Sequence, residues 1–558
     1  MYMYMEKMKK SISQYGMLIV LTMFIVIMLV ALDEIKHYRG WSKFLETSET
    51  IEEFVQTLQE EELVELGRVE LCFQGEALPY LKNLNAFMIS QPLMMQEQEE
   101  RLPFQGILSV HGENARLVIQ KDEYTDNLAA AIEKSHRFCG YLLTDEAYQK
   151  IDIILTGMPL VMLSTTHSET PEYSIEQIDD YVYNSETRYY GGIKIYEGEK
   201  KAEYNVCFHE KGQTSAIFDK ENYAIKLLDG KGKGIEASIF GMPASEKWKL
   251  QALYADVTKI REKTAWDLWE EIANAEKMTE QSFRENSAKM EYCEVILDEE
   301  YQGLYCMTYP VNEDTLQMKQ DDVLYKILDW NMPLPEDIQA SIDQNYEVCY
   351  PIRIRYPEEY THIETYWEPM KYYLACKYWV TNFELYADMI YTENLTDYYI
   401  FNQVVSGYDN YLKNTYVWAA KAKNKTGYKM VTLPWDMNYT FGDCYVYDGD
   451  NNYTAYNADT TVNYVEPVME QLFRDNVEDC GSLLRKKWNA YRKDILSTEH
   501  IQTIMKDNQE QIIRTGALRR ETDLWQEVKN TEDISTLLKY VEERMLYLDD
   551  YFNDFDAN

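Results

Sequence analysis

The sequence of 558 residues lacks the motifs of several common enzyme classes. Its nine cysteines are scattered and include no Cys-x2-Cys pair, which argues against a zinc framework and against a scaffold held by dense disulfides. Its seven histidines form no His-Glu-x-x-His motif, so a zinc enzyme is not expected. The absence of a Gly-x-Ser-x-Gly motif weakens the case for a serine hydrolase, and we find no internal repeat or low-complexity tract.

Basic residues are in the minority. Lys and Arg number 55 against 95 Asp and Glu, which gives a formal net charge of −40. A surface this acidic repels nucleic acid, and no basic stripe offsets it, so we expect no DNA or RNA partner. The charge would suit a basic protein substrate, but a soluble, self-repelling exterior is the plainer explanation. With only 14 prolines and 14% aromatic residues, the chain is expected to form an ordered globular body.

The N-terminus carries the one long apolar run. Three lysines within the first ten residues precede 22 uncharged residues, Ser11–Leu32, which reach about 33 Å as a helix and so span a bilayer core. We therefore predict a single-pass membrane protein, with residues 1–15 in the cytoplasm, a signal-anchor helix at 16–32 and the bulk of the chain extracytoplasmic. A cleaved signal peptide is the alternative, but no small-x-small cleavage site follows the run.

Beyond the anchor, apolar patterns predict an α+β protein. Residues 33–150 are predicted to form a small accessory α+β region, and 151–551 the main domain. A helix from about 257 is expected to bury Ala265, Leu268 and Trp269 on one face. The chain is predicted to be mostly helical after about 320, and nearly all amphipathic helix from 463 to 551. Period-two or buried apolar patterns predict strands at 68–73, 115–119, 151–155, 159–165, 191–197, 204–209, 222–228, 291–297 and 303–307.

The segment 401–442 contains the strongest chemical signal. Asp409 is followed five positions later by Asn414, and after a hairpin pattern comes Asp436 in Trp-Asp-Met-Asn-Tyr-Thr-Phe-Gly. A metal- and ATP-dependent phosphotransferase needs such a set in this order. One carboxylate orients the attacking hydroxyl, and an amide and a second carboxylate hold the metal against the phosphates. Protein kinases use the same spacing in their catalytic loop, followed by a metal-binding Asp before Phe-Gly.

A second segment, upstream of the first, carries residues that could bind the phosphates of a nucleotide. Gly212, Gln213 and Thr214 precede a strand pattern that ends at Lys226 in Ala-Ile-Lys. Backbone N–H groups of a glycine-containing loop can approach phosphates, and an ammonium at the end of a strand can offset phosphate charge. Lys220 is a second candidate for this lysine, and the sequence does not separate the two.

With these residues in place, the chain resembles the spore-coat CotH kinase family from about Pro159 to near Tyr551. The resemblance rests on ordered landmarks rather than on one motif. After Gly212-Gln-Thr-Ser, Lys220 and Tyr223-x-Ile-Lys226 these are Phe240-Gly-Met-Pro243, Trp248-Lys-Leu, Asp256, Arg261, Asp267, Tyr301-Gln-Gly-Leu-Tyr305, Tyr408-Asp409-x4-Asn414 and Trp435-Asp436-x-Asn438-x-x-Phe-Gly442.

The resemblance implies an atypical bilobal protein-kinase-like fold, with an N-lobe at about 151–315 and a mainly helical C-lobe at about 316–551. It implies transfer of phosphate from ATP, with Mg²⁺ or Mn²⁺, to Ser or Thr of a secreted, cell-surface or spore-coat protein. Asp409 would be the catalytic acid-base residue, and Asn414 and Asp436 would bind the metal.

The resemblance further implies that Lys226 or Lys220 touches the nucleotide, beside the loop of Gly212, Gln213 and Thr214. Asp267 would pair with that lysine from the helix after Asp256, and Glu270 and Glu271 compete for this part.

The chain also departs from the family pattern. Asn438 stands where a second aspartate is usual, which predicts a weaker second metal site. A catalytically weak pseudokinase that serves as a surface-anchored adhesion or assembly scaffold is therefore the alternative. A carbohydrate-active enzyme with paired carboxylates is a third and weaker one.

Overall fold

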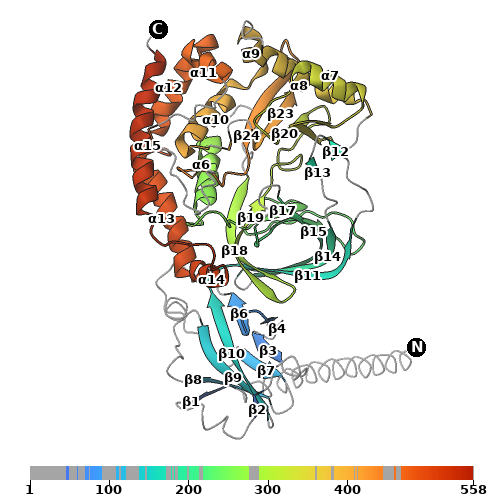
Figure 1. Cartoon of the computed structure of the whole chain (residues 1–558), viewed down its shortest axis with the longest axis vertical. Helices are drawn as coiled ribbons and strands as arrows, with labels where there is room; N and C mark the ends of the chain where they lie inside the picture. Colours follow the sequence, from blue (N-terminus) through green and yellow to red (C-terminus); the bar gives the residue numbers. More distant parts are fainter. Residues whose placement is uncertain are drawn as a thin grey trace, which may run out of the picture. The chain divides into compact units, whose positions relative to one another are not determined.

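The computed structural model divides into two compact units (Figure 1), residues 1–157 with 299–301, and residues 158–298 with 302–558. The predicted cytoplasmic segment 1–15 and membrane helix 16–32 lie outside the described residues. Among the residues that are described, no helix combines the length and apolarity needed to cross a membrane. The structure describes residues 45–48, 59–60, 70–73, 76–90, 108–111, 115–120, 137–144, 147–170, 177–178, 181–182, 187–197, 200–212, 218–275, 288–357, 361–378, 383–407, 409–410, 413–443, 458–459 and 467–556.

The described part of the first unit consists of strands. One mixed sheet has the order β1-β8-β9-β10-β6-β5, with β2 paired to β10, and a smaller sheet has the order β4-β3-β7. Apolar residues such as Phe87, Leu117, Phe138 and Ile153 are buried together as its core. The strands are β1 (Leu45–Ser48), β2 (Gln59–Glu60), β3 (Glu70–Phe73), β4 (Glu76–Ala77), β5 (Tyr80–Leu81), β6 (Ala86–Ser90), β7 (Leu108–His111), β8 (Arg116–Gln120), β9 (Arg137–Leu143) and β10 (Ala147–Thr156).

The second unit opens with a closed seven-stranded barrel. Its order is β11-β14-β15-β16-β17-β19-β18, and every strand that the sequence pattern predicted between 159 and 307 is confirmed. A small pair, β12 and β13, lies within the loop before β14. The strands are β11 (Leu160–Glu169), β12 (Gln177–Ile178), β13 (Tyr181–Val182), β14 (Arg188–Glu197), β15 (Lys200–Lys211), β16 (Asn222–Leu228), β17 (Lys247–Gln251), β18 (Lys289–Leu297) and β19 (Glu300–Tyr309).

Alternation along the barrel strands decides which lysines leave the barrel. Phe208 of β15, Ile225 of β16 and Trp248 of β17 are buried in the barrel core. Because side chains of a strand alternate between its faces, Lys211 and Lys249, at odd distances from these residues, lie on the outer face.

The expectation of a mostly helical chain after 320 is wrong in part, because a five-stranded sheet, β21-β22-β20-β23-β24, lies there. The hairpin pattern between Asn414 and Asp436 corresponds to β23 and β24, but the other three strands of the sheet have only two to five residues each, too few for a clear pattern. The strands are β20 (Val323–Ile327), β21 (Val348–Cys349), β22 (Ile352–Tyr356), β23 (Thr415–Lys421) and β24 (Tyr428–Pro434).

Helices cover this sheet and complete a large shared core. The predicted apolar face of the helix after 257 is confirmed, since Ala265, Leu268 and Trp269 of α6 are buried. The prediction of helices from 463 onward is confirmed as well, and Figure 1 shows α12, α13 and α15 along one side of the unit. The helices are α6 (Arg261–Ala275), α7 (Pro335–Asp343), α8 (Ile363–Tyr378), α9 (Phe383–Met389), α10 (Thr392–Val405), α11 (Pro467–Arg474), α12 (Cys480–Tyr491), α13 (Thr498–Arg514), α14 (Ala517–Leu524) and α15 (Ser535–Asn553), with 3-10 turns η3 (Val477–Asp479) and η4 (Asp554–Asp556). The fold is thus a mixed α+β fold with several sheets and C-terminal helices.

Candidate active site

The hairpin of β23 and β24 brings two of the predicted site residues together. Thr415, the first residue of β23, pairs with Pro434, the last of β24. Asn414 and Trp435 therefore face each other at the open end, where Trp435 N donates to Asn414 O at 2.9 Å. Asn414 and Asp436 both have positive φ, 55° and 59°, a conformation that Asn and Asp tolerate better than most residues.

Asp409 reaches the same place from the helical side. It follows the C-terminal end of α10, where Ser406 turns the chain with φ 53°. Asn414 Nδ2 donates to Asp409 Oδ2 at 2.8 Å, and Lys413 Nζ lies 2.9 Å from the same oxygen. The neighbouring Asn410 ties the two loops together, because its Nδ2 donates to Trp435 O at 2.5 Å.

The carboxyl of Asp409 is only 7% exposed, and burial raises its pKa to about 6. This value is a balance, in which Lys413 and the hydrogen bond from Asn414 lower the pKa and the negative charge of Asp436 adds to the rise. A carboxylate in this range is ionised at neutral pH yet basic enough to accept a proton, which is what a general base requires.

The barrel contributes cations to the same place. Trp435 lies directly before Asp436, and its ring carries Lys249 Nζ at 3.5 Å and Lys211 Nζ at 5.6 Å from the centroid. Lys211 Nζ also donates to Gln251 Oε1, and Gln251 Nε2 donates to Glu262 Oε1 at 3.3 Å. Glu262 lies in the first turn of α6 and is buried. These contacts join the barrel to the loop of Asp436.

The residues around Trp435 include several cations close to one another and two neighbouring acids. Burial lowers the pKa of Lys211 to about 8 although the charges of Asp436 and Glu262 raise it, and repulsion by Lys326 adds to the lowering. Burial also lowers the pKa of Lys249, with repulsion by Lys211, Lys326 and Arg355 added to it. Among the acids, burial and the charge of Asp436 raise the pKa of Glu262 to about 7.

The structure places the predicted lysines in other contacts. Lys220 is fully buried, and its Nζ donates to Ala252 O, Leu304 O and the carboxylate of Glu521. An ammonium has three donors, so these bonds leave Lys220 none for a nucleotide, against the expectation for that residue. Lys226 is half exposed and lies 3.2 Å from Glu246, and its nucleotide role stays a prediction.

Asp267 does not pair with either of these lysines. Lys263 Nζ lies 2.6 Å from its Oδ1, and Asn508 Nδ2 donates to its Oδ2 at 2.9 Å. The competing acids are engaged as well, Glu270 with Lys289 and Glu271 with His500. The carboxylate of α6 that faces the cluster is Glu262, one turn and a half earlier.

The glycine loop is described only at its start. Gly212 follows Lys211 directly and has φ 143°, a conformation that favours glycine. Gln213 and Thr214 lie outside the described residues, so their predicted role is untouched.

Sequence reasoning missed Lys211, Lys249, Glu262 and Lys413 as site residues, although signals for three of them were present. Lys211 and Lys249 stand at odd distances from buried strand residues, which indicates the outer face of the barrel. Lys413 lies within the Asp409–Asn414 spacing itself. Glu262 had no comparable signal, because only the course of the chain between β17 and α6 turns it toward Gln251.

The oxygen-bearing side chains suit a hard divalent cation. Within the described ranges, no group of three or more His, Cys, Asp or Glu residues is placed to hold a metal ion. Asn414 donates its amide nitrogen to Asp409, so its oxygen is the atom left for a cation. Asn438 Oδ1, two residues beyond Asp436, is buried without a hydrogen-bond partner among the described residues. A polyphosphate anion would in turn offset the repulsion between the positive charges of Lys211 and Lys249.

Comparison with known proteins identifies the family of this chain. A family model described as CotH kinase protein matches residues 208–548, which is more than half of the chain. The match confirms the family resemblance over a slightly shorter stretch than the sequence landmarks indicated, and it includes every site residue from Lys211 to Asp436. A search of curated proteins gave no match.

Proposed function

This chain belongs to the CotH kinase family, and we propose that it transfers the γ-phosphate of ATP to the hydroxyl of a protein Ser or Thr. Family membership implies kinase-like function and the use of ATP; the protein acceptor is the proposal. The observation that carries it is the meeting of Asp409, Asn414 and Asp436 with two barrel lysines around Trp435.

Each side chain has a place in this reaction. Asp409 accepts the proton of the substrate hydroxyl as its oxygen attacks the γ-phosphorus, and the bond from that phosphorus to the β,γ-bridging oxygen breaks, releasing ADP. Asp436 and Asn414 would hold a divalent cation, which supplies positive charge to the β- and γ-phosphates. Lys211 and Lys249 neutralise phosphate oxygens from the barrel side.

Lys413 lowers the pKa of the proposed base, Asp409. Its ammonium contacts Asp409 and favours the ionised carboxylate, which burial disfavours. The carboxylate is therefore available near neutral pH while it stays shielded from bulk water.

We also propose that the second unit, here called the kinase unit, acts outside the cytoplasm on a cell-surface or spore-coat protein. The support is the uncharged run Ser11–Leu32 with lysines before it, which suits an uncleaved anchor at 16–32 with residues 1–15 in the cytoplasm. Protease added to intact cells should digest the kinase unit. Its protection in intact cells but not in lysed ones would overturn the proposed location.

The central test is phosphate transfer from labelled ATP by purified residues 33–558. Asp409→Asn and Asp436→Asn should each lower turnover by about 10²–10⁴-fold, because each removes proton acceptance or charge stabilisation. Asp549→Asn is the matched control, since Asp549 pairs with Arg492 on the C-terminal helices and faces no site residue among the contacts described. Unchanged phosphate incorporation by Asp436→Asn would overturn the assignment. No thermal stabilisation of the wild type by ATP with Mg²⁺ or Mn²⁺ would favour the scaffold alternative.

A further inference from the structure

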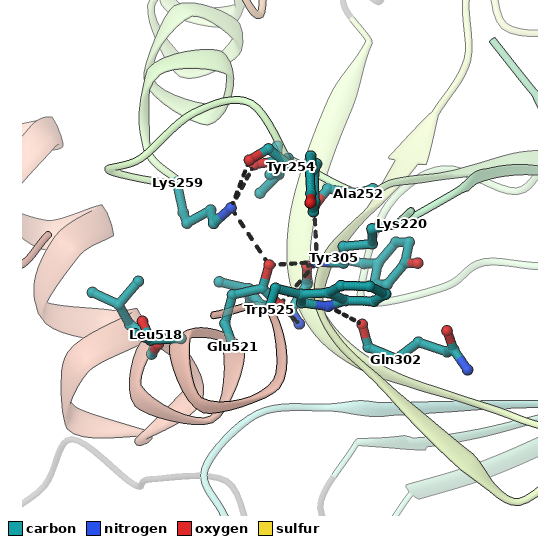
Figure 2. Close-up of polar contacts among 12 residues, drawn as sticks. Lys220, Ala252, Tyr254, Lys259, Gln302, Tyr305, Leu518, Glu521 and Trp525 are labelled. Carbon is teal, nitrogen blue, oxygen red and sulfur yellow. Dashed lines mark hydrogen bonds and ion pairs between the residues drawn. The ribbon is translucent and has the colours of Figure 1, made fainter. Parts of the chain in front are cut away.

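A buried carboxylate of the C-terminal helices lies at the centre of a polar network (Figure 2). Glu521 of α14 is fully buried, and its oxygens lie 2.8 Å and 2.9 Å from Lys220 Nζ. Lys259 Nζ lies 3.4 Å from the same carboxylate, and Leu304 N donates to it at 2.8 Å. Glu521 thus joins the helical part of the unit to the barrel.

The barrel strand is shaped to admit this carboxylate. Gly303 of β19 has φ 95°, and a Cβ at this position would lie 2.2 Å from Glu521 Oε2. Only glycine leaves room for the carboxylate to reach the next backbone amide, Leu304 N–H. The neighbouring Trp525 Nε1 donates to Gln302 O at 3.1 Å and fixes α14 against the same strand.

Both lysines donate hydrogen bonds to the segment 252–261, which leads from β17 to the first residue of α6. Lys220 Nζ donates to Ala252 O at 2.9 Å, and Lys259 Nζ donates to Leu253 O and Tyr254 O at 2.9 Å and 3.0 Å. Leu253 and Lys259 have positive φ, 52° and 61°, which is unfavourable for their side chains and needs support from the surroundings.

Two residues of the candidate active site flank this segment. Gln251 lies one residue before Ala252, and Glu262 lies three residues after Lys259. Gln251 hydrogen-bonds both Glu262 and Lys211. A shift of the segment therefore moves the partners that orient the Lys211 ammonium.

We propose that Glu521 is a positioning residue for nucleotide binding: through Lys220 and Lys259 it fixes the segment 252–261, and thereby Gln251, Glu262 and Lys211. The inference rests on the proposed function, since it assigns Lys211 to the nucleotide phosphates. It gives the helix α14 a part in the site without any contact to the reacting atoms.

A merely structural ion pair is the competing explanation, and the same helix supplies the control. Arg520, next to Glu521, pairs with Glu294 of β18 at 2.7 Å and 2.9 Å, and both side chains are buried. This pair also joins α14 to the barrel, but its described contacts do not include the segment 252–261. Glu294→Gln should destabilise the unit in a similar way without moving Lys211.

The experiment compares Glu521→Gln, Lys259→Met and Glu294→Gln in the purified full-length chain. We expect the Kd for ATP with Mg²⁺, measured calorimetrically, to rise about tenfold in Glu521→Gln and Lys259→Met, and less than about twofold in Glu294→Gln. Turnover at saturating ATP should fall much less than the affinity does. Lys259→Met tests the same network from the other partner and serves if Glu521→Gln does not fold.

Amide hydrogen exchange separates this inference from the proposed function. Exchange of amides 252–262 should speed up in Glu521→Gln and Lys259→Met but not in Glu294→Gln. If the wild type binds no nucleotide, the proposed function fails, and the exchange of this segment alone decides whether Glu521 positions it. Equal effects of all three variants on Kd, or unchanged exchange at 252–262, would overturn the positioning role.

Discussion

The lysines on the outer face of the barrel differ in the side chains that they contact. Lys211 and Lys226 are on the outer face of neighbouring strands, yet Lys211 contacts Gln251 and the ring of Trp435, whereas Lys226 is half exposed beside Glu246. A lysine enclosed with other cations is costly to keep charged, and an anion removes that cost. Asp436 and Glu262 offset the charge of Lys211 only in part, because its pKa is still lowered to about 8, so its surroundings favour a phosphate. Lys226 is half exposed to water and has the counter-charge of Glu246 beside it.

This contrast gives a test that chooses between the two lysines. Lys211→Met should weaken binding of ATP with Mg²⁺ by about tenfold or more, because a charge-assisted contact to phosphate is lost. Lys226→Met should change the Kd by less than about twofold, since a half-exposed ion pair contributes little. Isothermal titration of both variants against the wild type measures this. A larger effect of Lys226→Met would instead support the nucleotide contact that the family resemblance implies for Lys226.

At the scale of elements, the hairpin of β23 and β24 decides the geometry of the site. The sequence predicted this hairpin between Asn414 and Asp436, and its register, Thr415 opposite Pro434, is what brings the two residues together. The rest of the sheet could not be predicted in the same way, because β20, which pairs with the hairpin, has five residues of which four are buried, and so shows no alternation.

The loop after β24 depends on a glycine. Gly442 has φ 84°, and a Cβ there would lie 2.8 Å from Tyr540 Cε2, whose hydroxyl donates to Ser406 Oγ at 2.7 Å. Gly442→Ala should lower the free energy of unfolding by about 2–4 kcal/mol, from the left-handed backbone and from overpacking. Gly427→Ala is the matched control, because Gly427 has φ 78° and nothing within 4 Å of a Cβ. Urea denaturation should show the smaller loss for Gly427→Ala; equal losses would exclude the contact with Tyr540.

At the scale of the whole molecule, contacts between distant segments are what the sequence could not supply. The predicted motif at 409–436 is local, and its residues do meet. Lys220 was singled out because it stands near a glycine loop, yet its partner Glu521 lies 301 positions away. No spacing rule connects the two, because the pairing follows from the packing of α14 on the barrel. The helical periodicity of the C-terminal region predicted the helices but not which barrel residues they would reach.

The same buried network makes the stability of the unit depend on pH. Two lysines, Lys220 and Lys259, share the single carboxylate of Glu521, and burial lowers the pKa of Lys220 to about 8. An unfolded lysine has a pKa of about 10.4, so between pH 8 and 10.4 the unfolded chain binds more protons than the folded one, and stability rises with pH. Below pH 8 both states are protonated, and this contribution is flat.

Lys220→Met should remove that rise. We expect the gain in unfolding free energy between pH 7.5 and 9.5, measured by urea denaturation, to be about 1–2 kcal/mol smaller in Lys220→Met than in the wild type. Other lysines with lowered pKa values, such as Lys211 and Lys326, contribute to both proteins alike and cancel in the comparison. An identical pH dependence in the two proteins would mean that Lys220 keeps its proton throughout, because the carboxylate of Glu521 then outweighs the combined effect of burial and of Lys259.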